Sequence, residues 1–300
     1  MKRVLISGAS GLIGSALVGS FAAQGVRVVQ LVRGRASKSA SSSSRVSWDP
    51  LATLAVGVAS GFDAVIHLSG ESVVGRWTEE KKSAIFESRV VVTRNLATAL
   101  AKSEVKPGVF VSASAVGFYG NRGDELLREE SPGGQGFLPE VCREWEDASK
   151  IAAAAGIRTV NLRTGLVLSG KGGALAKILT PFKLGLGGRI GSGKQWWSWI
   201  HVDDMVGGIH HVLGAEWLSG PVNMVAPNPL RNAEFAKVLA SVLGRPAIFP
   251  VPEFGLRLVF GKMAADEMFL ASQRVAPEKL SGSGYAFRFS DLRSALEDLV

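Results

Sequence analysis

A glycine-rich turn close to the N-terminus limits the possible folds of this chain more than any other feature of its sequence. The short apolar run from Val4 to Ile6 leads into Gly8, and helical apolar spacing begins after Gly11. A strand, a glycine turn and a helix in this order are typical of nucleotide-binding α/β proteins. The spacing Gly-x-x-Gly-x-x-Gly, which ends at Gly14, differs by one residue from the general Gly-x-Gly-x-x-Gly fingerprint.

Each glycine of this turn has a predicted task. Gly8 permits the tight turn, Gly11 lets a phosphate approach the backbone, and Gly14 allows the helix to pack closely on the strand. The free amides at the helix N-terminus then form a phosphate site. We expect the pyrophosphate of a dinucleotide to lie against the residues of the turn, namely Gly8, Ser10, Gly11, Leu12, Ile13 and Gly14.

Strand and helix patterns alternate along the first half of the chain. We expect strands at 4–6, 26–32, 46–48, 62–68, 109–112 and 157–162, and helices at 11–23, 78–102 and 137–155. Strands separated by helices of this length indicate βαβ units. The fold class predicted is therefore α/β, with a Rossmann-type, doubly wound parallel sheet of about seven strands. The serine-rich stretch 35–44 has no packing face and is expected to be a loop.

The second half of the chain has a different character. The stretch 165–193 is rich in glycine and cannot form one continuous helix, whereas helices are expected at 202–213, 233–243 and 291–299. We predict that residues 1–164 form a dinucleotide-binding Rossmann domain. Residues 165–300 are predicted to form a smaller C-terminal α/β lobe that shares the sheet and covers the substrate cleft.

The end of the second strand favours a dinucleotide with an extra phosphate. An NAD-binding domain usually has an acidic residue there, which accepts a hydrogen bond from the ribose 2′-hydroxyl. This strand ends instead with Val32 and Arg33, and Arg35 follows. A guanidinium attracts a 2′-phosphate, which a carboxylate would repel. The sequence therefore predicts NADP(H) as the cofactor, with Arg33 at the 2′-phosphate.

Composition argues against several other classes of protein. Lys and Arg together number 34 against 26 acidic residues, but they form no basic block, so we expect no nucleic-acid partner. One cysteine, Cys142, and four histidines without zinc-ligand spacing predict no metal site. The sequence has no signal-peptide pattern and no apolar run of about 20 residues, so a cytoplasmic protein without a membrane partner is expected.

Motifs along almost the whole chain extend this interpretation. They are Gly8–Gly14, Trp48–Pro50, Asp63–Glu71, Arg76–Thr78, Ser88–Arg89, Ser112–Gly120, Arg163–Leu168, Pro181–Gly193, Gln195–His201 and Asn232–Phe235. In these motifs the chain resembles the extended short-chain dehydrogenase/reductases. More narrowly, it resembles the epimerase family proteins, also named nucleoside-diphosphate-sugar epimerases or cell-division-inhibitor homologues. The block 185–203 is the most specific, and the family's C-terminal extension corresponds to about 247–295.

The resemblance implies further cofactor contacts at the ends of the later strands. They are assigned to Leu68, Ser69, Gly70, Arg89, Ser112 and Arg163, in addition to Arg33. For Arg89 the alternative is an ion pair on a helix surface. For Arg163 the alternative is a structural arginine buried with a carboxylate.

The usual catalytic pair of this superfamily is missing. Short-chain dehydrogenases place Tyr-x-x-x-Lys on a helix, where the lysine lowers the pKa of the tyrosine and binds the nicotinamide ribose. The two positions fall here on Leu138 and Cys142, and leucine has no proton to give. Ser114, after the fifth strand, can still fill the role of the superfamily's orienting serine.

Three interpretations of the chemistry remain open. Tyr119 can act as the acid–base, its alternative being a packed aromatic at the sheet edge. Glu144 or Glu146 can act in its place. In the third interpretation the protein binds NADPH without redox turnover.

Two functions follow from these interpretations. The first is an NADP-dependent oxidoreductase or epimerase that acts on a small polar or nucleotide-linked substrate. The second is an NADPH-responsive regulator or scaffold, linked to cell division as the family's other name suggests. A homodimer is compatible with both.

A histidine and a group of tryptophans in the second half are assigned to structure. Asp203 is expected to cap the helix at 202–213, with His201 as a structural residue. Trp196, Trp197 and Trp199 are expected in the core and in the wall of the cleft.

Overall fold

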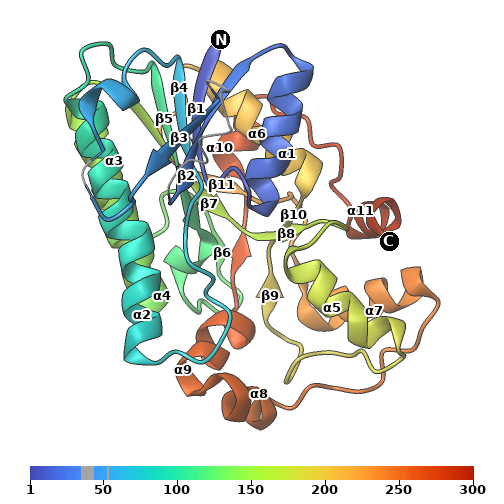
Figure 1. Cartoon of the computed structure of the whole chain (residues 1–300). Coiled ribbons are helices and arrows are strands. Elements are labelled where there is room, and N and C mark those ends of the chain that lie inside the picture. The colour runs from blue at the N-terminus through green and yellow to red at the C-terminus, as the bar shows by residue number, and fades with distance from the viewer. Residues whose placement is uncertain (35–43, 53) are drawn as a thin grey trace.

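A seven-stranded parallel sheet forms the centre of the molecule (Figure 1). The computed structural model describes residues 1–34, 44–52 and 54–300, so Arg35 and most of the predicted serine-rich loop lie outside the described residues. The strand order is β11-β7-β5-β4-β1-β2-β3. The strands are β1 (Arg3–Ser7), β2 (Arg27–Arg33), β3 (Arg45–Trp48), β4 (Ala64–His67), β5 (Val109–Ala115), β7 (Arg158–Thr164) and β11 (Gly220–Met224). The predicted fold class is confirmed.

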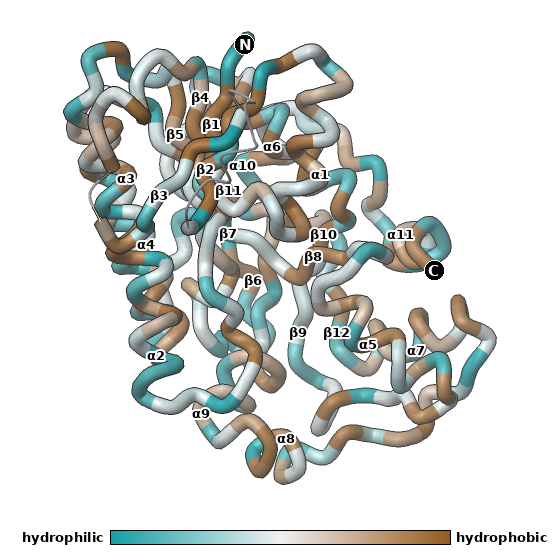
Figure 2. The backbone as a smooth tube through the Cα atoms, viewed as in Figure 1, coloured by the Kyte–Doolittle hydropathy of each residue, from teal (hydrophilic) through white to brown (hydrophobic). Residues whose placement is uncertain are grey.

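Helices cover both faces of this sheet because successive strand residues point to opposite sides. In β1, Val4 and Ile6 pack with α1 (Leu12–Ala23) and α6 (Val202–Gly214), while Leu5 packs with α3 (Val92–Ala101) and the end of α4 (Phe137–Ala154). Figure 1 shows α1 and α6 on one side of the sheet and α3 and α4 on the other, and Figure 2 shows the apolar strands between them. This is the two-sided layering of a doubly wound fold.

The long helix predicted at 78–102 is interrupted. Thr78 caps its first part, α2 (Glu79–Phe86), by accepting a hydrogen bond from the Lys81 amide. A π-helical turn, Glu87–Val91, then separates α2 from α3. Such turns occur often at functional sites, and this one carries Arg89.

The remaining elements pack beside the carboxyl ends of the strands. A second apolar core joins α5 (Gly173–Lys183), α7 (Asn232–Leu243), α11 (Leu292–Leu299), β8 (Leu166–Leu168) and β10 (Trp199–His201). The short elements are β6 (Leu126–Leu127), β9 (Trp196–Trp197), β12 (Leu230–Arg231), β13 (Arg274–Val275), α8 (Glu253–Phe260), α9 (Lys262–Ala265) and α10 (Glu278–Gly282). Because β11 and α6 belong to the central layers, residues beyond 164 contribute to the sheet; the domain boundary at 164 stays a prediction.

One cap was predicted wrongly. His201, not Asp203, caps α6, since its Nδ1 accepts a hydrogen bond from the Asp203 amide at 3.1 Å. His201 is fully buried, and its ring lies 3.9 Å from that of Phe289. Its assignment as a structural residue agrees with this packing. Among the described helices, none combines the length and apolar character needed to cross a bilayer.

Candidate functional site

The glycine turn forms one wall of a cavity of about 320 Å³. Gly8 has a φ of 72°, and a Cβ there would lie 2.7 Å from the backbone of Leu68. A Cβ on Gly14 would lie 2.1 Å from the Gly8 carbonyl oxygen, so only glycine allows α1 to start so close to β1. Gly11 begins α1 without any side-chain cap, which leaves the first amides of the helix available to a ligand.

The opposite wall of this cavity comes from β4, β5 and the segment after β7. The lining residues are Gly8, Gly11, Leu12, Ile13, Gly14, Leu68, Ala113, Ser114, Thr164, Gly165, Leu166, Val167 and Ala174. The cavity therefore lies at the carboxyl edge of the sheet, where doubly wound folds bind nucleotides. Backbone amides and a space kept open by glycines fit a dinucleotide pyrophosphate.

Arg33 lies at the end of β2, opposite Trp48 of β3. Its side chain is exposed and forms no hydrogen bond or ion pair with the described part of the chain. The nearest acid, Glu71, is bound at 2.7 Å by Lys81, whose hydrogen bond is the main reason that the pKa of Glu71 is lowered. The Arg33 guanidinium is thus without an ion-pair partner among the described residues.

Arg89 is a second arginine without a carboxylate partner in the described ranges. Its Nη1 donates to the Ile85 carbonyl at 3.2 Å, and its guanidinium lies over the Trp145 ring at 5.2 Å. Burial lowers the pKa of Arg89, yet an arginine stays protonated at neutral pH. A Cβ on Gly70 would lie 3.4 Å from the Arg89 guanidinium carbon, so this charge lies directly under the end of β4. Arg89 therefore does not form the helix-surface ion pair that was its alternative role.

Arg163 has a different environment. It is 4% exposed and forms a two-point ion pair with Glu146, with Nε–Oε1 and Nη2–Oε2 distances of 2.8 and 2.9 Å. Its Nη1 donates to the Tyr119 hydroxyl and to the Glu129 carbonyl. With these partners Arg163 matches the structural alternative, and its predicted cofactor contact stays a prediction.

The serines of β5 separate into two environments. Ser114 lines the cavity, and its Oγ donates to Glu146 Oε1 at 2.8 Å. Ser112 is fully buried, pairs in register with His67 and does not line the cavity. Of these two serines, only Ser114 lines the cavity beside the glycine turn.

Tyr119 lies inside the protein instead of facing the cavity. It is 0% exposed, and its hydroxyl donates to Asn223 Oδ1 at 2.7 Å and to the Arg128 carbonyl at 3.0 Å. Burial raises the pKa of Tyr119 to about 12. This is the packed aromatic of the alternative interpretation, and as it stands Tyr119 cannot exchange a proton with a ligand in the cavity.

The positions of the missing catalytic pair lie where the sequence predicts them. Leu138 and Cys142, on α4, both face Gly117 just beyond β5. Burial raises the pKa of the Cys142 thiol to about 12. Neither residue can therefore act as an acid–base at neutral pH.

Glu146 lines a second cavity and also accepts the hydrogen bond from Ser114, which lines the first. This second, larger cavity, of about 630 Å³, lies between α4 and β7 and is lined by Glu146, Arg163 and Asn161 among others, but by no residue of the glycine turn. Ser114 lines the smaller cavity only. The larger cavity is therefore not the dinucleotide site. Glu144 forms none of these contacts.

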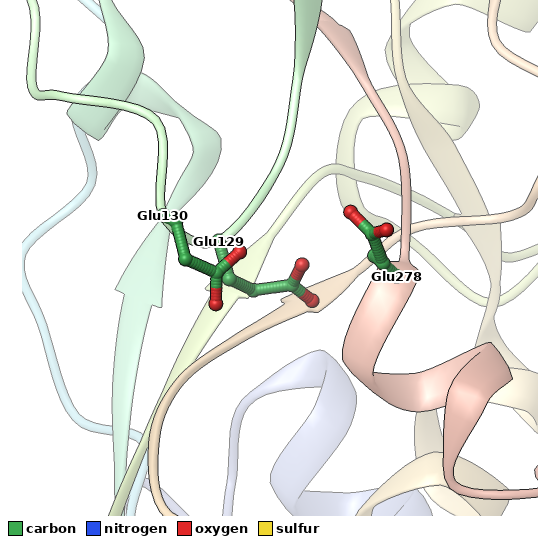
Figure 3. Close-up of side chains that lie close together, drawn as sticks. All are labelled: Glu129, Glu130 and Glu278. Carbon is green, nitrogen blue, oxygen red and sulfur yellow. The ribbon is translucent and has the colours of Figure 1, made fainter.

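Figure 3 shows an acidic cluster, and none of its three members lines either cavity. One carboxylate oxygen from each of Glu129, Glu130 and Glu278 lies within 4.8 Å of the others. Arg128 binds Glu278 at 2.7 Å, and Lys279 lies 4.0 Å from Glu130. Neighbouring cations thus already balance the two exposed members. We assign no metal to this cluster, and the expected absence of a metal stays a prediction.

The three tryptophans near residue 200 pack against other side chains. Trp199 is fully buried, and Trp197 packs edge-on against Phe235. Trp196 lies between Arg231 and Arg274. None of the three tryptophans lines either of the two cavities.

Comparison with known proteins agrees with this geometry. The model of the NAD dependent epimerase/dehydratase family matches residues 4–223, and a domain of unknown function, DUF1731, matches residues 251–299. The human epimerase family protein SDR39U1 is 37% identical over 99% of both chains. Epimerase family protein YfhF of Bacillus subtilis is 36% identical over 99% of this chain and 98% of its own.

Solved structures give the same result. The crystal structure of human SDR39U1 with NADPH has a TM-score of 0.90 and 34% identity, and the match covers 99% of this chain and 98% of that one. A nucleoside-diphosphate sugar epimerase from Corynebacterium glutamicum has a TM-score of 0.81 and 39% identity; this chain spans 57% of its length. The chain is therefore a member of the NAD dependent epimerase/dehydratase family with an epimerase-type Rossmann fold, as its motifs predicted.

Proposed function

We propose that the protein is an NADP(H)-dependent oxidoreductase or epimerase that acts on a small polar or nucleotide-linked substrate. The observation that carries the proposal is that two arginines, Arg33 and Arg89, form no ion pair among the described residues, while the acid that influences both, Glu71, is already bound by Lys81. An arginine that forms no ion pair can bind an anionic ligand. That the human relative was crystallised with NADPH supports the choice of cofactor.

The two arginines are assigned to different ends of the cofactor. Arg33 ends β2, beside the adenosine half, and is proposed to bind the 2′-phosphate. Arg89 lies under Gly70 and next to α4, so it is proposed to bind oxygens of the nicotinamide half.

Binding of a cofactor fragment tests this division. The Arg89→Met variant is expected to bind NADPH about tenfold more weakly while its affinity for adenosine 2′,5′-bisphosphate stays unchanged. Isothermal titration calorimetry measures both affinities. An equal loss for the fragment and for NADPH would place Arg89 at the adenosine end instead.

When bound, the cofactor supplies a hydride donor or acceptor at its nicotinamide ring. Ser114 then takes the place of the missing tyrosine as the residue that meets the substrate. Because its proton is donated to Glu146, its oxygen can accept a hydrogen bond from a substrate hydroxyl. Glu146, held in place by Arg163, receives the proton that Ser114 passes on.

Stopped-flow absorbance of bound NADPH, or of NADP with the corresponding alcohols, tests turnover. A panel of nucleotide sugars and small carbonyl compounds serves as the set of substrates. We expect Ser114→Ala and Glu146→Gln each to slow hydride transfer by about a hundredfold, and Glu144→Gln, on the same helix, to serve as the matched control. A Tyr119→Phe variant that lost turnover while Ser114→Ala kept it would contradict the assignment.

A regulatory function without turnover is the second candidate. It is favoured by one observation, the occupation of the pair positions by Leu138 and by Cys142, which has a raised pKa. A partner protein captured only in the presence of NADPH would support it. Hydride transfer with any member of the panel would argue against it.

A further inference from the structure

Several large apolar side chains are exposed on α8, which lies at the lower edge of the molecule in Figure 1, and on the segments next to it. On α8, Phe254 and Leu258 are each 74% exposed, and Val259 is 64% exposed. Ile248 and Phe249 precede α8, and Leu184 follows α5; all three are at least half exposed. These six residues are here named the α8 patch. Single exposed apolar residues are ordinary, but a group on adjoining segments marks an interaction surface.

Backbone hydrogen bonds hold the segments of the α8 patch together. The amide of Phe249 donates to the Gly187 carbonyl at 3.2 Å, and that of Val251 to the Arg189 carbonyl at 2.8 Å. A Cβ on Gly188 would lie 2.2 Å from the Phe249 carbonyl oxygen, so a glycine is needed there. The glycine-rich stretch after α5 thus allows a close backbone contact that builds this surface. Figure 2 shows the apolar character of α8 at the same edge.

Positive charge surrounds the α8 patch. The segments 183–191 and 245–263 contain five cations, Lys183, Arg189, Arg245, Arg257 and Lys262, and a single carboxylate, Glu253. Arg257 is paired with both Glu253 and Asp266, and Lys262 is paired with Asp266. Lys183 and Arg245 are exposed and form no ion pair in the described chain. The cations of these two segments, here named the rim cations, therefore leave an excess of positive charge beside the α8 patch.

Exposed apolar side chains together with unpaired cations distinguish between two possible partners, a second copy of the chain and a lipid surface. A second copy that docked through the same patch would bring like charges together across the two-fold axis. An anionic lipid surface attracts the cations and accepts the apolar side chains at its acyl boundary. Because the described helices include none that crosses a bilayer, such a contact is peripheral.

We propose that the α8 patch docks the protein onto an anionic membrane surface. Phe254 and Leu258 enter the headgroup–acyl boundary, and the rim cations lie among the lipid headgroups. A peripheral contact of this kind needs neither a membrane-spanning helix nor a signal segment.

Co-sedimentation of the full chain with vesicles tests the proposal. We expect binding to vesicles of phosphatidylcholine with phosphatidylglycerol, weaker binding at high salt, and little binding to phosphatidylcholine alone. The double variant Phe254→Ser, Leu258→Ser should lower the partition coefficient about tenfold or more. Trp217→Ser is the matched control, since Trp217 is 72% exposed in the turn between α6 and β11. It should leave binding unchanged.

A second double variant tests the proposal without changing any apolar residue, so that misfolding is not the cause of a loss of binding. Lys183→Gln with Arg245→Gln alters only exposed charges and should weaken binding to the anionic vesicles severalfold. Failure of the wild-type protein to bind anionic vesicles, or equal binding by all variants, would overturn the proposal. Light scattering that revealed a dimer disrupted by the Phe254 and Leu258 changes would identify a second copy as the occupant and would also overturn it.

Discussion

At the scale of single residues, the glycine turn shows how closely sequence and geometry agree. The three glycines were assigned tasks from their spacing, and a Cβ would collide with backbone at Gly8 and Gly14 but only approach it, at 3.3 Å, at Gly11. For Tyr119 and Arg163 the sequence left two alternatives each and named no partner residue. Their partners, Asn223 and Glu146, come from other elements, and only the three-dimensional arrangement joins them.

A helical pair of glycines provides a direct test of the turn. Gly14→Ala is expected to destabilise the protein by several kcal/mol and to abolish NADPH binding, because its Cβ has no room beside the Gly8 carbonyl. Gly19→Ala, in the same helix, meets no atom within 4 Å and should stabilise α1 by up to about 1 kcal/mol. Urea unfolding and calorimetry measure the two effects. Similar behaviour of the two variants would refute the packing argument.

His67 makes stability depend on pH. It is fully buried at the end of β4, its Nδ1 lies 2.5 Å from the Ser7 hydroxyl, and burial lowers its pKa from 6.5 to about 4. The fold thus favours the neutral ring. Its contribution to stability is present above pH 6.5 and is lost as the pH falls through about 4, and amounts to roughly 3 kcal/mol.

Urea unfolding of the wild type and of His67→Asn, above pH 6.5 and near pH 4, isolates this contribution. The wild type should lose more stability on acidification than the variant does. Equal losses would show that His67 is not the group responsible.

At the scale of elements, apolar periodicity was sufficient for six strands of the sheet and for most helices. It did not reveal β11, whose sequence begins with Gly220 and Pro221 and has no continuous apolar run. Apolar periodicity also did not reveal α5, an eleven-residue helix, because the glycines on either side of it indicated a loop. The break of the long helix at 87–91 is a tertiary effect, since the π-turn turns Arg89 toward Trp145.

One contact joins the last part of the chain to the α4 helix of the site. Glu267 accepts hydrogen bonds from the amides of Phe137 and Leu138, at 3.0 and 2.7 Å, and so caps α4 from a distance of 130 residues in sequence. Both carboxylate oxygens are used, and the charge lies at the positive end of the helix. The segment 251–299 therefore supports the Rossmann layer directly.

Removing this cap should destabilise the protein. We expect Glu267→Ala to lower the free energy of unfolding by about 2 kcal/mol and Glu267→Gln by about half as much, since the amide keeps one acceptor but not the charge. Glu297→Ala, an exposed position on α11, is the control and should change it by less than about 0.5 kcal/mol. Urea denaturation distinguishes these values; a Glu267 variant that matched the control would contradict the capping role.

At the scale of the whole molecule, the family motifs predicted the fold and the location of the cleft. The chemistry of the site was harder to predict, because the residues that we propose in place of the usual pair come from different elements. Ser114 on β5, Glu146 on α4 and Arg163 on β7 form one hydrogen-bonded group. No local motif in the sequence connects them.

The central claim is that Arg33, which ends β2 and forms no ion pair among the described residues, selects a dinucleotide with a 2′-phosphate. Calorimetric titration of the wild type and of Arg33→Gln with NADPH and with NADH tests it most directly. The wild type should bind NADPH at least about tenfold more tightly than NADH, and Arg33→Gln should lose most of that preference with little change for NADH. Equal affinity of the wild type for the two cofactors, or binding of neither by folded protein, would contradict the claim.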